Sequence, residues 1–158
     1  MKILITGAKT ATALKLSKAF NQFEILLGDY GDLPQITTNS YALVDLGTWN
    51  EEVLAHNLLT KCLDYGVDML LPLYESEVAA VAKSLVLFDE FNVEVLLNEH
   101  HHLTQSTSKD WAIFRKGQLL FSSVPQLNAS QYPALNGAYY LNDEKKETAI
   151  IAIANPVK

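Results

Sequence analysis

The chain has 158 residues, of which 49% are hydrophobic and 19% charged, and its formal net charge is −6. This length suits one domain, since compact domains mostly run about 100–200 residues, and the composition excludes a disordered chain. The acidic balance argues against nucleic acid and anionic membrane surfaces as partners, because both repel negative charge.

The apolar runs and the first residues favour a cytoplasmic protein. No run approaches the ~20 apolar residues that a membrane span requires. Met1 leads directly into a strand pattern, without the three regions of a secretory signal. Cys62 is the one cysteine, so an intrachain disulfide and a cysteine metal cluster are excluded. Its apolar, helix-like context favours a core position over a nucleophile.

The first hundred residues alternate between strand and helix patterns. Short apolar runs predict strands, at 2–6, 23–27, 41–44, 67–71 and 93–97. Helical spacing of apolar residues predicts helices, at 11–20, 49–65 and 75–91. Parallel strands need long crossovers, which are usually helices, so the alternation predicts a Rossmann-like, three-layer, doubly wound α/β fold. We expect parallel strands in the order 3-2-1-4-5.

The last third of the chain has a different pattern. Residues 108–121 are expected to form a helix capped by Ser108, and 122–136 a loop around two prolines. Apolar runs at 137–141 and 148–153 flank a polar turn, which predicts a terminal β-hairpin. The chain is therefore divided into a Rossmann-like domain, 1–107, and a helix, loop and hairpin extension of the same domain, 108–158.

The predicted hairpin is too small to be stable alone, because two isolated strands are marginal in water. Its apolar residues must therefore pack on something, and they are Tyr139, Tyr140, Ile150, Ile151 and Ile153. A partner, such as a second copy of the chain, would cover them. The alternative is that the hairpin adds to the edge of its own sheet.

The strand order also predicts where a ligand would bind. In open parallel sheets, ligands lie beyond the carboxyl ends of the strands where the strand order reverses, here between the first and fourth strands. Amides at the start of the first helix favour an anion, and nearby side chains would add donors. The candidate ligand-binding residues are Gly7, Ala8, Lys9, Thr10, Thr12, Asp29, Tyr74 and Glu75.

The dinucleotide-binding motif is incomplete. Its three small positions hold Gly7, Thr10 and Ala13, so only the first is glycine. Asp29 stands where an acid commonly binds an adenosine ribose, but a turn after Gly28 explains it equally well. Neither a P-loop nor a strained nucleophile elbow is present, and no catalytic residue is assigned.

No metal site is predicted either. The adjacent residues His100, His101 and His102 cannot all face one ion from regular structure. Glu75 and Glu77 open a helix, where the helix dipole by itself explains carboxylates.

Three segments resemble the pre-ATP-grasp domain of carbamoyl-phosphate-synthase-like ATP-grasp ligases. They are LITGA at 4–8, Asp29 after the second strand and, above all, VDMLLPLYESE at 67–77. The resemblance continues through the strand at 93–98, SKDW at 108–111 and Val124-Pro125, and covers about residues 1–135. It implies a Rossmann-like domain that packs on an ATP-grasp body and helps to shape the acceptor-substrate cleft.

In that family, later lobes hold the nucleotide and magnesium. Here Asn136 stands near the position of the ATP-contacting lysine, and the metal-binding acids do not follow. We therefore expect no ATP-grasp catalysis by this chain alone. Our leading interpretation is a non-catalytic pre-ATP-grasp-like domain that binds a small molecule at the strand tips or serves as a subunit for a separate ATP-grasp protein. The alternatives are a small protein that binds ATP, another nucleotide or NAD(P), and a structural homodimer.

Overall fold

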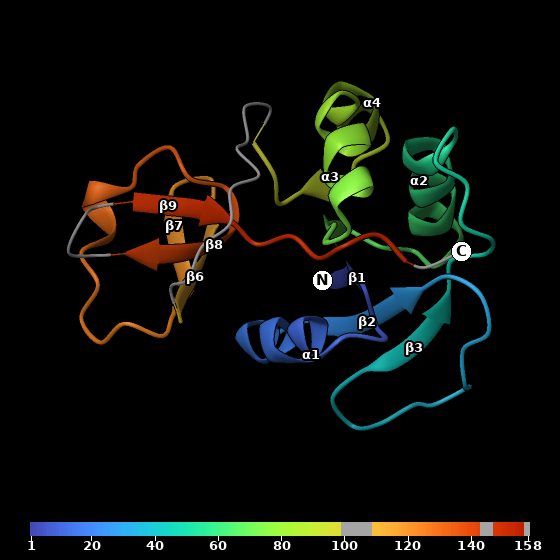
Figure 1. Cartoon of the computed structure of the whole chain (residues 1–158), viewed down its shortest axis with the longest axis horizontal. Helices are drawn as coiled ribbons and strands as arrows, with labels where there is room; N and C mark the ends of the chain where they lie inside the picture. Colours follow the sequence, from blue (N-terminus) through green and yellow to red (C-terminus); the bar gives the residue numbers. More distant parts are fainter. Residues whose placement is uncertain (99–108, 143–146, 157–158) are drawn as a thin grey trace.

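The structure is a computed structural model that describes residues 1–98, 109–142 and 147–156. It contains two β-sheets that lie side by side (Figure 1). The strands of the first sheet are β1 (Lys2–Thr6), β2 (Glu24–Asp29), β3 (Ala42–Asp45), β4 (Met69–Leu71) and β5 (Glu94–Val95). Their order is β3-β2-β1-β4-β5 and every pairing is parallel, which confirms the expected order and the α/β fold class.

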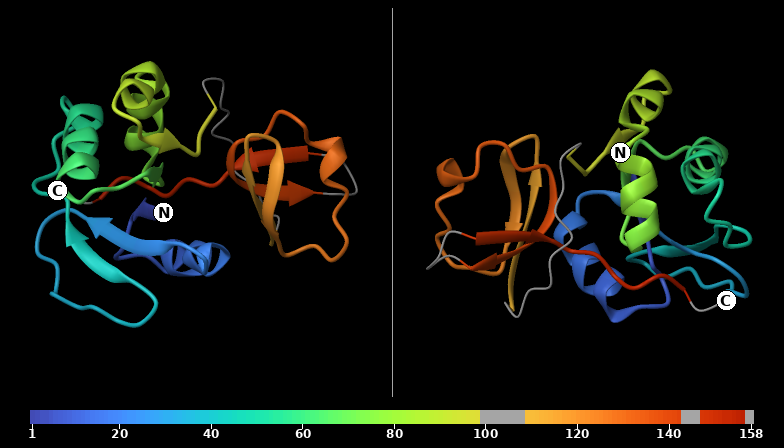
Figure 2. Two further views of the ribbon diagram at one scale, coloured as in Figure 1. Left: turned by 180° about the vertical axis from the view of Figure 1, so that it is seen from behind. Right: turned by 45° about the horizontal axis from the view of Figure 1, so that its top comes forward.

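Helices cover both faces of the first sheet, as a doubly wound fold requires (Figure 2). They are α1 (Ala11–Ser17), α2 (Leu54–Asp64), α3 (Glu75–Ala82) and α4 (Leu85–Glu90), with a short 3-10 helix η1 (Lys18–Phe20) after α1. Successive side chains of a strand point to opposite faces. Leu4 of β1 therefore packs with α2 and α3, whereas Ile3 and Ile5 pack with Ala13 and Leu16 of α1.

Two of the expected helices have different bounds. The helix expected from residue 49 begins only at Leu54, because residues 50–53 form a turn in which Asn50 accepts from the backbone of Glu52 and Val53. The helix expected over 75–91 is divided into α3 and α4, with Ser84 in a non-helical conformation between them.

The second sheet is antiparallel, in the order β7-β6-β8-β9. Its strands are β6 (Asp110–Arg115), β7 (Gln118–Ser122), β8 (Gly137–Asn142) and β9 (Glu147–Ile150), with a 3-10 helix η2 (Ala129–Gln131) between β7 and β8. The helix expected at 108–121 is therefore wrong. Lys116 and Gly117 both have positive φ, 50° and 81°, which is the geometry of a two-residue hairpin turn. The expected cap, Ser108, lies outside the described residues.

The expected terminal hairpin is confirmed as β8 and β9. It does not add to the first sheet; β8 pairs instead with β6. This pairing and the packing on the first sheet bury Tyr139, Ile150 and Ile151 within the chain. Lys15 of α1 lies over the rings of Trp111 and Tyr140, at 5.4 and 5.7 Å from their centroids. The cover that these apolar residues require thus comes from the chain itself.

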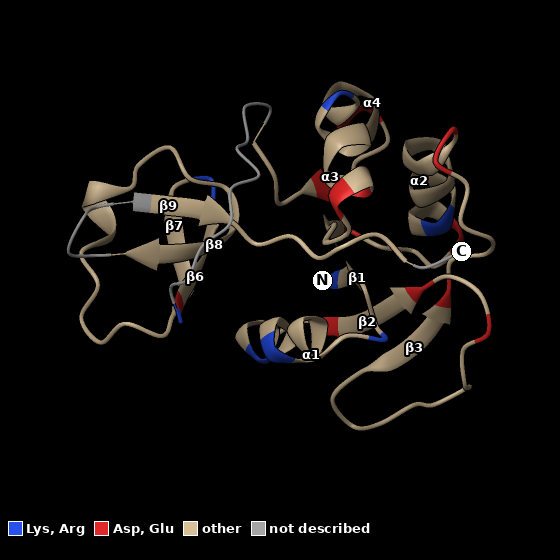
Figure 3. Cartoon of the chain, viewed as in Figure 1, with Lys and Arg blue, Asp and Glu red and all other residues tan. Residues whose placement is uncertain are grey.

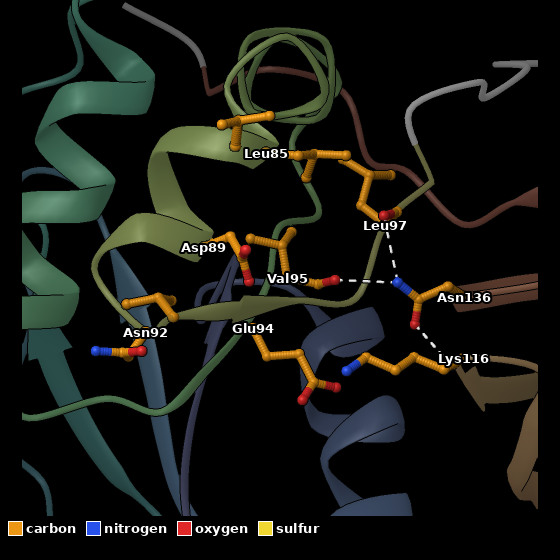
Figure 4. A pocket seen from close by; sticks show the side chains of 10 residues that line it. Leu85, Asp89, Asn92, Glu94, Val95, Leu97, Lys116 and Asn136 are labelled. Carbon is orange, nitrogen blue, oxygen red and sulfur yellow. Dashed lines mark hydrogen bonds between the residues drawn. The ribbon is translucent and has the colours of Figure 1, made fainter.

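Polar contacts also join the two sheets beside a cavity of about 460 Å³ at the outer edge of β5 (Figure 4). The side-chain amide of Asn136 donates to the carbonyls of Val95 and Leu97, at 3.1 and 3.3 Å. Its side-chain oxygen accepts from the backbone amide of Lys116 at 3.0 Å. Arg115 of β6 donates two hydrogen bonds to the Glu94 carboxylate, at 2.7 and 2.9 Å. The Asn136 side chain thus satisfies backbone carbonyls at the edge of β5 that would otherwise be free to pair with a further strand.

Asn136→Ala removes two hydrogen bonds between the two sheets, to Val95 and Leu97, and one within the second sheet, from Lys116. Because an intramolecular hydrogen bond contributes roughly 1 kcal/mol net, we expect the free energy of unfolding to fall by about 2 kcal/mol. Urea unfolding followed by circular dichroism measures the change. Asn21→Ala, at an exposed position after η1, is the control and is expected to stay within about 0.5 kcal/mol of the parent. Equal stabilities of the two variants would refute this role for Asn136.

Candidate functional site

The carboxyl ends of β1, β2 and β4 meet at a buried cluster of polar side chains. The cluster consists of Thr6, Asp29, Tyr30, Tyr74 and Glu77, each no more than 4% exposed. Figure 3 shows acidic residues at the ends of β2 and β3 and at the start of α3. Polar groups buried this deeply must be hydrogen-bonded.

Glu77 lies at the centre of this cluster, in the first turn of α3. Its carboxylate accepts from the Thr6 hydroxyl at 2.6 Å, from the Tyr74 backbone amide at 3.1 Å and from the Tyr30 hydroxyl. The Thr6 oxygen in turn accepts from the Leu73 amide at 2.7 Å. Burial raises the pKa of Glu77 to about 7, although these three hydrogen bonds act in the opposite direction. Glu77 therefore joins β1 and β2 to the start of α3.

Asp29 fixes the loops that follow β1 and β2. It accepts from the amides of Lys9 and Tyr30, both at 2.8 Å, and from the Tyr74 hydroxyl at 2.7 and 2.8 Å. Burial, followed by the nearby carboxylates, raises the pKa values of Tyr30 and Tyr74 above their ordinary range. Both phenols are therefore neutral hydrogen-bond donors at physiological pH.

The turn after β1 has the conformation expected at a Rossmann-like strand tip. Gly7 has φ +78°, and its carbonyl accepts from the amide and the hydroxyl of Thr10 at 2.9 and 2.7 Å. The Thr10 oxygen caps α1 by accepting from the Ala13 amide at 3.3 Å. The Lys9 ammonium donates a hydrogen bond to the Tyr30 carbonyl at 2.7 Å. Lys9 and Thr10, expected as ligand donors, thus hold the local structure.

The chain's own C-terminal segment fills the crevice between Gly7 and α3. The Ile153 amide donates to the Leu73 carbonyl at 2.8 Å, and the Ile153 carbonyl accepts from the Glu75 amide at 3.0 Å. Asn155 accepts from the Ser76 amide at 2.9 Å and donates to the Ser76 hydroxyl at 2.7 Å. A Cβ on Gly7 would lie 2.6 Å from Cδ1 of Ile153, so the absence of a side chain at Gly7 makes this close approach feasible.

The structure brings most of the expected site residues to one edge of the sheet. Gly7, Lys9, Thr10, Asp29, Tyr74 and Glu75 all lie there; the Ala8 amide bonds the Gly28 carbonyl at 3.1 Å, and Thr12 lies half-buried in the first turn of α1. Sequence reasoning did not assign Thr6, Tyr30, Ile153 or Asn155 to this site, and it explained Glu77 as a cap. The capping role is confirmed, since Glu77 accepts from the Tyr74 amide. In the sequence, only the position of Tyr30 directly after Asp29 could have indicated that Tyr30 belongs to this site.

An aromatic group covers the cluster on one side. The ring of Trp49 lies edge-on to Tyr30 and Tyr74, with centroids 5.0 and 5.5 Å away. Its buried indole nitrogen has no hydrogen-bond partner among the residues that the structure describes. Trp49 therefore excludes water from the two phenols and their carboxylates.

The other candidates for chemistry lie away from the strand tips. Cys62 is buried in α2 and burial raises the pKa of its thiol to about 12, which makes it a poor nucleophile. His56 is exposed on α2. His100, His101 and His102 lie outside the described residues, and the described ones contain no group of three or more metal-ligating side chains. None of the helices within the described ranges could cross a membrane.

No protein-family model matches this sequence, and no curated protein does. The resemblance to pre-ATP-grasp domains therefore rests on the quoted motifs.

The raised pKa of Glu77 predicts a pH-dependent stability. The unfolded chain releases this proton near the ordinary pKa of 4.5, whereas the folded chain keeps it to about pH 7. Stability should therefore fall as the pH rises from about 4.5 to 7, by about 3 kcal/mol at ~1.4 kcal/mol per pKa unit. Urea unfolding from pH 4 to 8 measures the slope. Glu77→Gln should flatten it over this window, and a variant with the parent's slope would contradict the assignment.

Proposed function

We propose that this chain is a pre-ATP-grasp-like domain that binds a small ligand at the strand tips and is not catalytic by itself. One observation carries the proposal. At the point where the strand order reverses, the amides of Glu75 and Ser76 each hold an acceptor oxygen, at 3.0 and 2.9 Å. These oxygens belong to Ile153 and Asn155 of the same chain. The start of α3 thus donates hydrogen bonds to acceptor groups, and it lies next to the Gly7 turn, where open parallel sheets bind ligands.

The crevice that residues 152–155 occupy has a polar side and an apolar side, which sets the chemistry of a ligand that would displace them. The first amides of α3 favour a carboxylate or another acceptor, while Gly7 and Leu73 present an apolar surface. A small carboxylate with an apolar group fits both sides. The same geometry suits a domain that helps to shape an acceptor-substrate cleft in an ATP-grasp ligase.

The buried polar cluster supports a role in positioning rather than in chemistry. The carboxylates of Asp29 and Glu77 are occupied by hydrogen bonds from Lys9, Tyr30, Tyr74 and Thr6. Asp29 would have to release such donors before it could bind a ribose, which disfavours the nucleotide- or NAD(P)-binding alternative. The homodimer alternative loses its main argument, because the terminal hairpin is already covered within the chain.

A thermal-shift panel of ATP, NAD, NADP, amino acids and carboxylates tests the proposed binding. A ligand of the native state raises stability by RT ln(1 + [L]/Kd), or about 2.7 kcal/mol at 100 times Kd. We expect a carboxylate or amino acid, at a concentration that displaces residues 152–155, to raise Tm in the parent and much less in Gly7→Ala, where a Cβ enters the crevice. Gly47→Ala is the matched control, since Gly47 also has positive φ, +86°, but no atom within 4 Å of the added Cβ. Equal shifts in both variants would rule out this site.

The proposed lack of catalysis has a separate test. Phosphoryl transfer depends on positioned cations and metal-binding carboxylates, which the cluster at the strand tips does not offer because its carboxylates are hydrogen-bonded. We expect no release of phosphate from ATP and magnesium above the background of a boiled sample. Turnover that requires magnesium and is abolished by Lys9→Ala would overturn the non-catalytic proposal.

A further inference from the structure

The C-terminal segment crosses from one sheet to the other in an extended conformation (Figure 1, red). It leaves the second sheet where the Ile151 amide donates to the Ala138 carbonyl at 2.9 Å. Two residues later, Ile153 forms a parallel bridge with Tyr74, at the end of the first sheet. The segment therefore belongs to the second sheet by connectivity and docks on the first sheet as an added short strand.

The docking groove recognises both the backbone and the side chains of this segment. The Leu73 carbonyl and the Glu75 amide pair with the backbone of Ile153. Ser76 pairs with the Asn155 carboxamide through its amide and its hydroxyl, at 2.9 and 2.7 Å. The Ile153 side chain fills the space that Gly7 leaves open. This is recognition by strand addition, in which backbone bonds give affinity and alternate side chains give specificity.

We propose that this groove is a binding site for an extended peptide segment that carries a branched apolar residue followed two positions later by Asn. Residues 152–155 occupy the site within the same chain. The inference rests on the proposed function, because both place the ligand at the start of α3. It narrows the chemical class of the ligand to an extended peptide. The ligand donates one backbone N–H to Leu73 and supplies acceptors to Glu75 and Ser76.

An internal occupant has an advantage over a free peptide. A tethered segment acts at an effective concentration in the millimolar range, so a free peptide competes poorly with it in the parent chain. Weakening the internal segment should open the groove. Ile153→Gly with Asn155→Ala does this, because it removes the two side chains that the groove recognises and leaves the groove unchanged.

The experiment measures binding of an acetylated, amidated peptide that copies residues 152–156, Ala-Ile-Ala-Asn-Pro. Isothermal titration compares the parent chain with the Ile153→Gly, Asn155→Ala double variant. We expect the double variant to bind the peptide at least about tenfold more tightly than the parent does. The control peptide, Ala-Asn-Ala-Ile-Pro, has the same composition with the two recognised residues exchanged, and we expect it to bind at least about tenfold more weakly.

A change in the groove itself completes the test. Glu75 is exposed at the first position of α3, where proline is well tolerated, and Tyr74 before it has φ −67° and ψ 138°, as a residue before proline prefers. Glu75→Pro thus removes the amide that bonds the Ile153 carbonyl and keeps the helix. Added to the double variant, it should abolish peptide binding while circular dichroism stays unchanged.

Failure of this inference is distinct from failure of the proposed function. Absence of binding to the double variant, equal binding by the parent, or equal binding of the control peptide overturns the peptide site, whatever the small-molecule panel gives. Peptide binding that survives Glu75→Pro overturns it as well. A carboxylate that binds at Gly7 while the peptide does not leaves the proposed function standing alone.

Discussion

The fully buried carboxylate of Glu77 is the constraint on which the strand-tip edge of this protein depends. A buried carboxylate is tolerated only where hydrogen bonds replace its water, and here the donors come from β1, β2 and the start of α3. Satisfying this one group therefore fixes three elements relative to one another. Asp29 fixes the loop after β1 to the same cluster, because it accepts from the Lys9 backbone amide. The ring of Trp49 covers the phenols of Tyr30 and Tyr74. The polar cluster at this edge is consequently fixed by hydrogen bonds and buried away from water.

The second sheet contributes to this edge through the C-terminal segment that follows β9. It contributes to both cores: Trp111 and Ile113 join the core of Ile3 and Ile5, while Phe114 and Tyr139 join the core of Leu4. Asn136 and the Arg115–Glu94 pair fix it to β5, on the other side of the switch point. From there the C-terminal segment returns to Gly7 and α3. The crevice is thus shaped by residues from both ends of the chain, and the proposed functions depend on how firmly the segment stays there.

Most of the first sheet was predictable, because its information is local. Each strand is a short apolar run, each crossover carries helical spacing, and parallel pairing with right-handed crossovers leaves few topologies. The β6–β7 hairpin was missed for an equally physical reason. Trp111 to Phe114 are all buried, so both faces of β6 are covered and no alternation shows in the sequence. A short apolar run of this kind is ambiguous between helix and strand, and the turn at Lys116 and Gly117 and the pairing of β6 with both β7 and β8 decide it.

The sequence by itself determined the strand order, the place where that order reverses and the positions of Gly7, Asp29 and Glu75 beside it. These follow from periodicity and from the chirality of crossovers, which act over tens of residues. Only the tertiary structure decided what the residues at that place do. Thr6 meets Glu77 across 71 positions and Ser76 meets Asn155 across 79, and no local pattern encodes contacts at such separations. They arise because burial requires every polar group to find a partner, and the partner is whichever donor the packed elements bring within reach.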